Sequence, residues 1–522
     1  MKPNESQKEA IKFYQGPCLV LAGPGSGKTY TIAKRIDTLI NKHQVRPEEI
    51  LVITFSKASS IDMKKRFETV AEKNIFGVTF GTFHGVFYNI LKTEKVIGAK
   101  ALLSEKDRMM IISDILKEID NEYVSDQEDE KELLAEISTS IANVKNELLH
   151  TEKIEGKIRN NISLKSVFIK YEAIKKENEK IDFEDMISML YEYFSQNENR
   201  LKLWQDRFKY ILVDEFQDVN MAQYEVLNLL AKPNDNLFVV GDDDQSIYQF
   251  RGATPNIMKK FLEDYKHAVT ISLNVNYRST KYIVVGALRV ISHNRARFKK
   301  EIEALSKVRE PVHVQEVRDA SEEASYIIEE IKKKKRVGIP LTEVSILYRT
   351  VADVRAIHQA LLENNIPFNL KDYIPDIYEH FIAKDILAYL KIATGDMKRQ
   401  NFLRIINKPL RYLSRSSLDA EIVDFQKLIK AYRDKEWMRD RILGLEWDIK
   451  TIAIKKTPYT AIAYIREKVG YNNYINEYAK ERNINRSVLM GILDELQDLS
   501  EAFNTIEEML SHVDNRRMKF VN

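Results

Sequence analysis

The feature that most constrains this chain is a glycine-rich turn between a short apolar run and a helix-like segment. Residues 18–21 (Cys-Leu-Val-Leu) predict a buried strand, and residues 31–40 carry apolar side chains at helical spacing. A turn in this position directs backbone N–H groups and a helix N-terminus at a bound phosphate. The residues expected to bind it are Ala22, Gly23, Pro24, Gly25, Ser26, Gly27, Lys28 and Thr29.

Two residues of this turn carry chemistry. Lys28 is expected to reach the β- and γ-phosphates of a nucleoside triphosphate, and the Thr29 hydroxyl to ligate Mg²⁺. The alternative is a glycine-rich loop in which Gly-Lys-Thr occurs by chance. The strand before the turn and the helix after it favour the nucleotide site.

Composition limits the class of protein. A chain of 522 residues is too long for one core, so several domains are expected. The net charge of +3 does not indicate nucleic acid, so such a partner would need a local basic surface. The single cysteine, Cys18, excludes a disulfide framework, and no apolar run reaches the roughly 18 residues that span a bilayer. With no signal peptide at the N-terminus, we expect a soluble, cytoplasmic protein without a membrane partner.

Short apolar runs that each end in a polar loop predict the central strands of a parallel α/β sheet. They occupy residues 50–55, 78–80, 210–213 and 237–240. A stretch rich in Glu, Lys, Leu and Ile at about residues 99–178 separates the first two runs from the last two and predicts a helical module. The first domain is therefore expected to be discontinuous, with a helical insertion.

A second α/β pattern begins near Asn276, with strand candidates at residues 312–317 and 344–348. Two strands make a poor sheet, so this second domain is predicted to be incomplete. The basic run at residues 332–336 is interpreted as a solvated helix end rather than a targeting signal or a DNA contact. From about residue 375 the pattern is helical again.

A second element of a nucleotide site follows the apolar run at residues 211–213. Asp214 and Glu215 end this predicted strand, where both side chains can face a ligand at the edge of the sheet. Asp214 is expected to hold Mg²⁺, directly or through water, and Glu215 to orient and deprotonate the attacking water. The alternative, a surface acidic turn, does not explain the apolar run before it.

The segment Asp214–Asp218 (Asp-Glu-Phe-Gln-Asp) resembles motif II of the UvrD/Rep/PcrA group of superfamily 1 DNA helicases. Other blocks are similar to the motifs of that group in content and order. They are Asn4, Gln7 and Ala10 (Q motif), Thr54–Ser56 (motif Ia), Gly81–His84 (motif Ib), Val240–Ala253 (motif III), Leu273–Thr280 (motif IV), and Ile346–Arg349 followed by Ile366–Phe368. The resemblance covers residues 4 to about 368, and beyond that only the helical character agrees.

The resemblance implies further residues for an ATP site. Gln7 would bind the adenine edge, Tyr277 would stack on the adenine, and Arg278 would reach the γ-phosphate. Gln245 would sense the γ-phosphate and relay its presence to the DNA site. Tyr30 stands where relatives commonly have an arginine packed on the adenine, and its ring could stack there. The implied catalytic residues are Lys28, Asp214, Glu215, Gln245 and Arg278.

The resemblance also implies contacts with single-stranded DNA. Stacking on an aromatic side chain contributes roughly 1–3 kcal/mol per base without sequence preference. Position 250 has Phe where relatives often have Trp, which keeps a stacking face of smaller area. The implied DNA-binding residues are Phe55, Thr82, His84, Phe250 and Arg251.

Motifs V and VI of the family have no counterpart in the sequence. Motif VI supplies an arginine to the γ-phosphate, and loss of such an arginine costs about 10³- to 10⁵-fold in turnover. The chain is therefore interpreted as a truncated helicase that binds Mg-ATP but hydrolyses it slowly, with little stimulation by DNA.

The fold that the resemblance implies is α/β: a RecA-like P-loop NTPase core with a parallel sheet and helical insertions, an incomplete second RecA-like core and a helical C-terminal region. The expected divisions are residues 1–98 with 179–275 for the first core, 99–178 for its helical insertion, 276–374 for the partial second core and 375–522 for a second helical insertion.

The implied function is that of an ATP-dependent 3′→5′ DNA helicase or translocase in DNA repair or replication. It would use ATP and Mg²⁺ and act on single-stranded DNA and duplex junctions. The alternative is a nucleotide-dependent DNA-binding or regulatory module that never unwinds DNA. A helicase subunit of a recombination nuclease and an RNA helicase are further interpretations, but the sequence shows no nuclease signature and no feature that binds a 2′-hydroxyl.

Overall fold

The computed structural model describes residues 2–71, 75–98, 101–119, 127–156, 158, 162–249, 252–254, 256–295, 297–306, 310–349, 353–371, 376–481 and 486–520. Contacts between residues divide the chain into two compact units, Met1–His313 and Val314–Asn522. Among the helices of the described ranges, none is long and apolar enough to cross a membrane.

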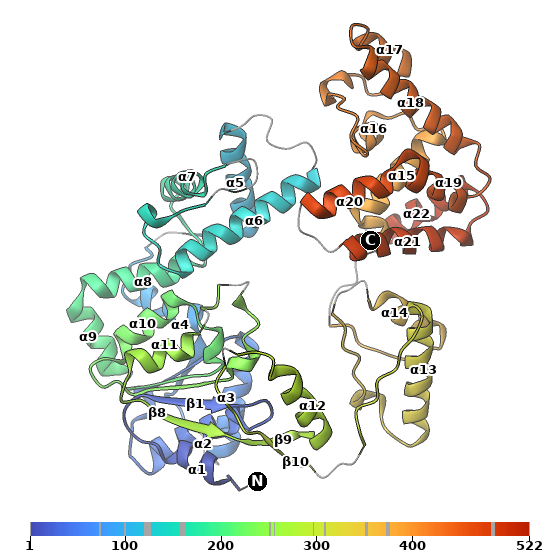
Figure 1. The fold of residues 1–522 in the computed structure, drawn as a ribbon. Coiled ribbons are helices and arrows are strands. Elements are labelled where there is room, and N and C mark those ends of the chain that lie inside the picture. Colours follow the sequence, from blue (N-terminus) through green and yellow to red (C-terminus); the bar gives the residue numbers. More distant parts are fainter. Residues whose placement is uncertain are drawn as a thin grey trace. The chain divides into compact units, whose positions relative to one another are not determined.

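A six-stranded parallel sheet forms the centre of the first unit (Figure 1). Leu19 pairs with Val239 on one side and with Thr270 on the other, which sets the register of the middle strands. The strands lie in the order β3 (Thr79–Thr82), β2 (Ile50–Thr54), β6 (Tyr210–Val213), β7 (Leu237–Gly241), β1 (Cys18–Ala22) and β8 (Val269–Leu273). The five strands predicted for this sheet are confirmed, as is the α/β class.

Helices cover both faces of the sheet. Successive side chains along a strand point to opposite faces, and in the central strands the side chains on both faces are buried. Val20 and Ala22 of β1 pack with one set of helices, whereas Leu19 and Leu21 pack with the other. The first set is α1 (Glu5–Lys12), α2 (Lys28–Asn41) and α3 (Lys57–Ala71), and the second is α4 (Phe83–Thr93), α8 (Asp185–Gln196), α9 (Glu198–Arg207), α10 (Met221–Ala231) and α11 (Ile257–Asp264). Burial on both faces explains why the central strands are almost entirely apolar.

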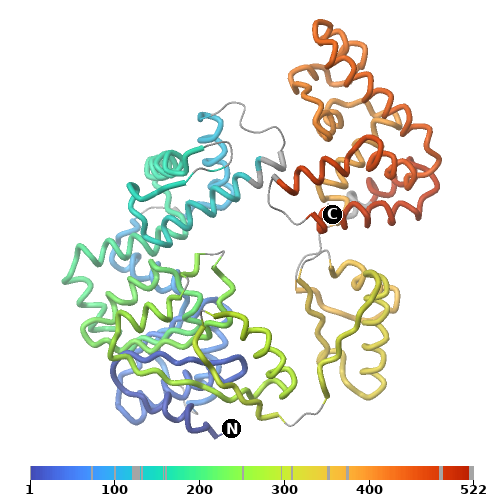
Figure 2. Tube along the Cα trace, viewed as in Figure 1, coloured from blue at the N-terminus to red at the C-terminus, as the bar shows by residue number. Residues whose placement is uncertain are grey.

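The predicted helical module interrupts this layer arrangement. It contains α5 (Glu105–Ile119), α6 (Gln127–Asn146) and α7 (Leu164–Glu177), and its ends are joined by the short pair β4 (Ala101–Leu102) and β5 (Lys180–Ile181). The three helices have their own apolar core, which includes Ile112, Ile137 and Tyr171. In Figure 2 the chain leaves the sheet as a blue segment and returns to it as a green one.

A two-stranded parallel sheet follows β8. Its strands are β9 (Val275–Thr280) and β10 (Glu303–Ser306), with α12 (Lys281–Ile291) between them. The strands predicted at residues 312–317 and 344–348 are wrong, because neither segment is a strand in the described structure. In the second segment Ile346 and Tyr348 pack against neighbouring helices while Leu347 is 93% exposed. The side chains alternate as in a strand, but a strand also needs a second backbone to hydrogen-bond with.

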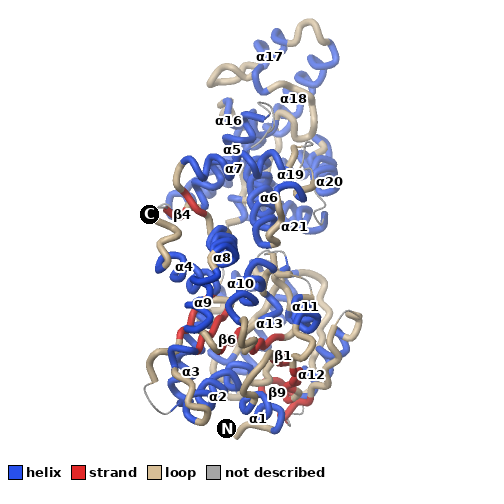
Figure 3. Tube along the Cα trace, turned by 90° about the vertical axis from the view of Figure 1, so that its left-hand side faces the viewer, coloured by secondary structure: helices blue, strands red, loops and turns tan. Residues whose placement is uncertain are grey.

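The second unit is helical, as predicted from about residue 375 onward. α13 (Ala320–Arg336) packs with α14 (Arg355–Glu363). Lys333 to Arg336 form the exposed last turn of α13, so the basic run is a solvated helix end as predicted. Figure 3 shows α16 to α21 as helices joined by loops. The helices of the larger core are α15 (Phe381–Ala393), α16 (Arg399–Ile405), α17 (Phe425–Ala431), α18 (Glu436–Ala453), α19 (Pro458–Tyr464) with a π-helical turn (Ile465–Val469), α20 (Tyr471–Glu481), α21 (Arg486–Leu499) and α22 (Ile506–Phe520).

Candidate nucleotide site

The phosphate loop leaves β1 at Ala22 and enters α2 at Lys28. Gly25 (φ +67°) and Gly27 (φ +82°) adopt the left-handed backbone region that glycine tolerates best. Gly27 is the N-cap of α2 and has no side chain with which to cap the first N–H groups of that helix. The Oγ atom of Ser26 is buried and has no hydrogen-bond partner in the described structure. These unsatisfied polar groups at a helix N-terminus suit an anion such as a phosphate.

Three further predicted residues lie at this loop. Gln7 is in α1, and its Nε2 atom donates a hydrogen bond to the Ser26 carbonyl at 2.9 Å. Thr29 and Tyr30 are half-buried in the first turn of α2. The structure therefore brings the Q-motif glutamine into contact with the phosphate loop.

Lys28 meets the acidic pair at the end of β6. Its Nζ atom lies 2.5 Å from Oε2 of Glu215, 187 residues further along the chain. The contact is possible because β6, β7 and β1 are neighbours whose C-terminal ends share one edge of the sheet. Glu215 has φ +51°, a region that residues other than glycine seldom adopt, and such backbone strain concentrates at functional sites.

Two carboxylates beside Glu215 have raised pKa values. Asp214 is 7% exposed, and its burial, reinforced by the charge of Glu215, raises its pKa to about 6 although Lys28 opposes the shift. Burial and Glu215 also raise the pKa of Asp218 to about 6, and its Oδ1 atom has no partner among the described residues. A bound cation would favour the ionised form of each carboxylate. The chemistry of Asp214 and Thr29 therefore fits the predicted Mg²⁺ site.

Gln217 connects the acidic pair to the loop after β7. Its Nε2 atom donates to Oε2 of Glu215 at 3.0 Å, and its Oε1 atom accepts from the backbone N–H of Asp242 at 2.9 Å. Gln245, the predicted γ-phosphate sensor, donates from Nε2 to Oδ2 of Asp242 at 2.7 Å. Gln217 and Asp242 lie within the blocks that resemble motifs II and III, but nothing in the sequence predicts a role for either residue. Only their positions inside those motifs could have indicated one.

β9 places the motif IV residues beside the phosphate loop. The backbone N–H of Tyr277 donates to the Gly25 carbonyl at 2.9 Å, and Nδ2 of Asn276 donates to the Pro24 carbonyl at 2.7 Å. A Cβ atom built on Gly25 would lie 2.8 Å from Cβ of Arg278. The predicted nucleotide residues from both ends of the first unit therefore converge.

The residues predicted to bind DNA are more widely distributed. Phe55 follows β2, is 37% exposed, and its ring stacks on that of Tyr248 with centroids 4.9 Å apart. Thr82 is the N-cap of α4 and lines a cavity of 610 Å³ between α3, β3, α4 and α9. His84 packs edge-on against Phe183 at 5.7 Å, and its burial lowers its pKa. Phe250 and Arg251 lie outside the described residues.

Comparison with known families covers nearly the whole chain. The UvrD/REP helicase N-terminal domain matches residues 3–266, and the UvrD-like helicase C-terminal domain matches residues 271–516. The second match extends beyond Phe368, where the motif resemblance ended.

Curated relatives agree with these matches. The chain is 33% identical over 535 residues to the putative ATP-dependent DNA helicase YjcD of Bacillus subtilis (strain 168), covering 98% of this chain and 68% of that protein. It is 35% identical over 420 residues to the ATP-dependent DNA helicase PcrA of Staphylococcus epidermidis and 34% identical to that of Staphylococcus aureus. Both PcrA matches cover 80% of this chain and 57% of the relative. With the phosphate loop and the acidic pair in contact at the edge of a parallel sheet, these matches show that the chain belongs to the UvrD/REP helicase family.

Proposed function

We propose that the chain is an ATP-dependent 3′→5′ DNA helicase or translocase that couples ATP hydrolysis to movement along single-stranded DNA. We place it in the cytoplasm, in DNA repair or replication. The observation that carries the proposal is the 2.5 Å contact between Lys28 and Glu215, which joins the two halves of a nucleotide site. The curated relatives named above as ATP-dependent DNA helicases support the same reaction class.

The proposed ATP site uses the loop from Ala22 to Thr29 for the phosphates. Gln7 would hold the adenine edge, and the rings of Tyr277 and Tyr30 would stack on the base. The contacts of Gln7 with Ser26 and of Tyr277 with Gly25 support this arrangement, since both residues already touch the loop. Thr29 and Asp214 would ligate Mg²⁺, which supplies positive charge to the phosphates when it is bound.

The proposed hydrolysis depends on a change of partner at Lys28. In the structure its ammonium group pairs with Glu215. Phosphate oxygens compete for the same ammonium group, so ATP would release Glu215 to accept a proton from the attacking water. Gln245 and Arg278 would contact the γ-phosphate and stabilise the charge that develops on it.

The proposed DNA path crosses the ends of β2 and β3. Phe55 would stack on a base, which an exposed aromatic ring allows at any sequence. Thr82 and His84 would contact the strand at the start of α4, and Phe250 and Arg251 would extend the path.

We also retain the four expected divisions as the domain assignment: residues 1–98 with 179–275, 99–178, 276–374 and 375–522.

Calorimetric titration with a non-hydrolysable ATP analogue, with and without Mg²⁺, tests the nucleotide site. We expect saturable, Mg²⁺-dependent binding that weakens about tenfold or more in Lys28→Ala. Lys8→Ala is the matched control, because Lys8 forms only an exposed pair with Glu5 in the described structure. No uptake by the unaltered chain, or equal uptake by Lys28→Ala, would contradict the proposed site.

A strand-displacement assay tests the motor activity. We expect slow unwinding of a duplex with a 3′ single-stranded tail and none of one with a 5′ tail, in line with the slow hydrolysis predicted from the missing motif VI arginine. Nucleotide-dependent DNA binding without displacement of either substrate would instead favour the regulatory alternative.

A further inference from the structure

Three aspartates after β7 surround one buried lysine. The Nζ atom of Lys300 forms an ion pair with Oδ1 of Asp242, and it lies 2.5 Å from Oδ1 of Asp243 and 2.9 Å from Oδ2 of Asp244. The Lys300 side chain is 2% exposed. It comes from the segment between α12 and β10, so it joins two regions that are 58 residues apart.

Two neighbouring groups also contact these aspartates. Arg297 donates from Nε and Nη2 to the two carboxylate oxygens of Asp244 at 2.7 and 2.5 Å, and the backbone N–H of Phe298 donates to Asp243 at 2.7 Å. Burial lowers the pKa of Lys300, but the hydrogen bonds that its ammonium group donates to Asp242 and Asp243 outweigh burial and raise the pKa overall. Lys300 is therefore a buried cation enclosed by three carboxylates, and its removal would leave those negative charges uncompensated.

The aspartate turn is connected to the proposed nucleotide site. Asp242 accepts a hydrogen bond from Gln245 through Oδ2, the oxygen that Lys300 leaves free. Its backbone N–H donates to Gln217, and Gln217 donates to Glu215, the partner of Lys28. A continuous series of polar contacts thus runs from the phosphate loop to Lys300.

The same turn is connected to the proposed DNA path and to β9. Tyr248, three residues after Gln245, stacks on Phe55. Beyond Lys300 the chain enters β10, which pairs with β9 through Glu303 opposite Val275 and Ala304 opposite Asn276. Lys300 therefore connects the turn at Asp242–Gln245, which lies between the proposed nucleotide and DNA residues, to β9, the strand that carries Arg278.

We infer that Lys300 is a positioning residue that couples nucleotide binding to DNA binding by holding the Asp242–Gln245 turn against the β9–β10 segment. The inference rests on the proposed function. Without the ammonium group, three neighbouring carboxylates repel one another. The turn then no longer holds Gln245 and Tyr248 in fixed positions relative to each other. Nucleotide and DNA would then still bind, but neither would change the affinity of the other.

Binding linkage tests this inference without requiring hydrolysis. The dissociation constant of a fluorescent oligo-dT of about 16 nucleotides is measured with and without a saturating Mg²⁺ complex of the non-hydrolysable ATP analogue. The ratio of the two constants is the coupling factor, which for coupled sites is typically about 5 to 150. Four chains are compared: the unaltered chain, Lys300→Met, Lys300→Arg, and Lys299→Met as the control at an exposed neighbouring lysine.

We expect Lys300→Met to bind each ligand alone within about fivefold of the unaltered chain while its coupling factor falls below about 2. Lys300→Arg keeps the charge and should retain most of the coupling, and Lys299→Met should retain all of it. A purely structural role would weaken both affinities and leave their ratio unchanged.

Two results would overturn the inference: independent binding of the two ligands by the unaltered chain, or equal coupling in Lys300→Met. Because unbalanced carboxylates can prevent folding, Lys300→Met combined with Asp243→Asn is measured in parallel, with circular dichroism as the folding check. Equal coupling in that folded double variant would overturn the inference as well. Failure of the unaltered chain to bind the analogue at all would instead contradict the proposed function.

Discussion

Gly25 shows how strongly a single residue limits this site. Its positive φ excludes most side chains, and it also lies directly beneath β9. A Cβ atom there would come within 2.8 Å of Cβ of Arg278 and 2.9 Å of Oδ1 of Asn276. Cβ of Arg278 can move only with the backbone of β9, and Oδ1 of Asn276 is held by hydrogen bonds from the backbone N–H groups of Arg278 and Ser279.

We predict that Gly25→Ala weakens binding of the ATP analogue about tenfold or more, because β9 must move away from the phosphate loop. Gly16→Ala is the matched control. It has φ +92°, but within the described part of the chain no neighbouring group lies within 4 Å of the added Cβ, so it carries the backbone strain without the steric overlap. We expect Gly16→Ala to lose about 1–2 kcal/mol of unfolding free energy and Gly25→Ala to lose more, as measured by urea titration, and only Gly25→Ala to lose affinity. Equal affinity in the two variants would contradict the role of the overlap.

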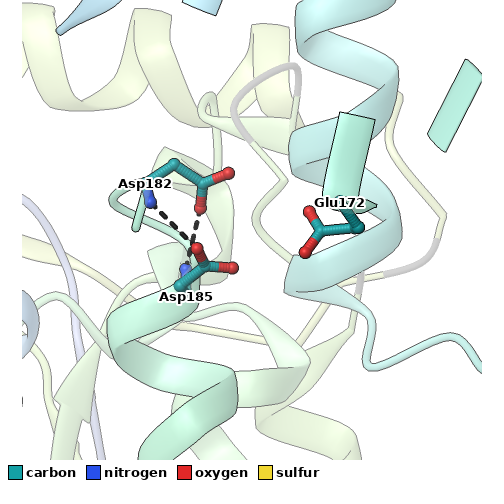
Figure 4. A group of neighbouring side chains, drawn as sticks. All are labelled: Glu172, Asp182 and Asp185. Carbon is teal, nitrogen blue, oxygen red and sulfur yellow. Dashed lines mark hydrogen bonds between the residues drawn. The ribbon is translucent and has the colours of Figure 1, made fainter. Parts of the chain in front are cut away.

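At the scale of elements, a buried group of charges joins the helical module to the sheet-bearing part of the first unit. Glu172, Asp182 and Asp185 lie close together on α7, beside β5 and on α8 (Figure 4). Lys145 of α6 and Lys175 of α7 each contact all three carboxylates at 2.5 to 3.1 Å. Burial raises the pKa of Asp182, but the two lysines outweigh it and hold the pKa below its usual value.

We predict that Lys175→Met destabilises the first unit by about 3–5 kcal/mol, because removing one partner leaves a buried charge uncompensated. Adding Asp185→Asn to Lys175→Met should recover part of this loss by lowering the number of negative charges. Lys170→Met is the control, since Lys170 pairs with Glu118 at the surface and should contribute only about 0–1 kcal/mol. Urea unfolding of the four chains measures the differences, and a double variant no more stable than Lys175→Met would argue against charge balance as the cause.

The N-terminus of α15 contains a histidine whose protonation affects stability. His380 is its N-cap, and the ring Nδ1 atom accepts a hydrogen bond from the backbone N–H of Ile382 at 3.3 Å. Burial, followed by the charges of Arg355 and Lys384, lowers the pKa of His380 to about 4. A lowered pKa means that the unfolded chain binds this proton first as the pH falls. The histidine therefore favours the folded state above about pH 6.5, and this contribution is lost as the pH falls toward 4.

We predict that, between about pH 7 and pH 4.5, the unfolding free energy of the second unit falls by about 2 kcal/mol more in the unaltered chain than in the His380→Asn variant. Asparagine can still cap α15 but does not titrate in this range. Urea unfolding at several pH values, followed by a signal from the helical unit, measures the difference. Parallel pH profiles for the two chains would show that His380 is not responsible.

At the scale of the whole chain, two extended segments leave apolar side chains in solvent. Val314 and Leu347 are each 93% exposed, and neither belongs to a strand in the described structure. Extended segments with exposed apolar residues are prone to pair with other chains.

We predict that the double variant Val314→Lys and Leu347→Lys self-associates less than the unaltered chain, as measured by sedimentation velocity across a concentration series. Its unfolding free energy should stay within about 0.5 kcal/mol, because exposed positions contribute little to stability. Ile331→Lys, at a buried position of α13, is the contrasting change and should unfold this region. Unchanged association in the double variant would show that these segments do not mediate it.

The sequence by itself determined the features that depend on local pattern. The glycine-rich turn, the buried strands before and after it, the helical module and the helical region from about residue 375 all follow from periodicity and turn residues, which act over a few positions. The family resemblance named residues such as Gln7, Gln245 and Arg278, and the structure places all three near the phosphate loop or its partners. Their chemical roles stay predictions.

Tertiary structure alone decided which distant residues meet. Gln217 joins Glu215 to Asp242, and Lys300 contacts three carboxylates, of which Asp242 lies 58 residues before it in the chain. These contacts form because the order of the strands brings the segments together. The same reason explains the failure at residues 312–317 and 344–348. Alternating side chains are a local property, but a strand exists only when a neighbouring backbone accepts and donates its hydrogen bonds, and that neighbour is chosen by the fold.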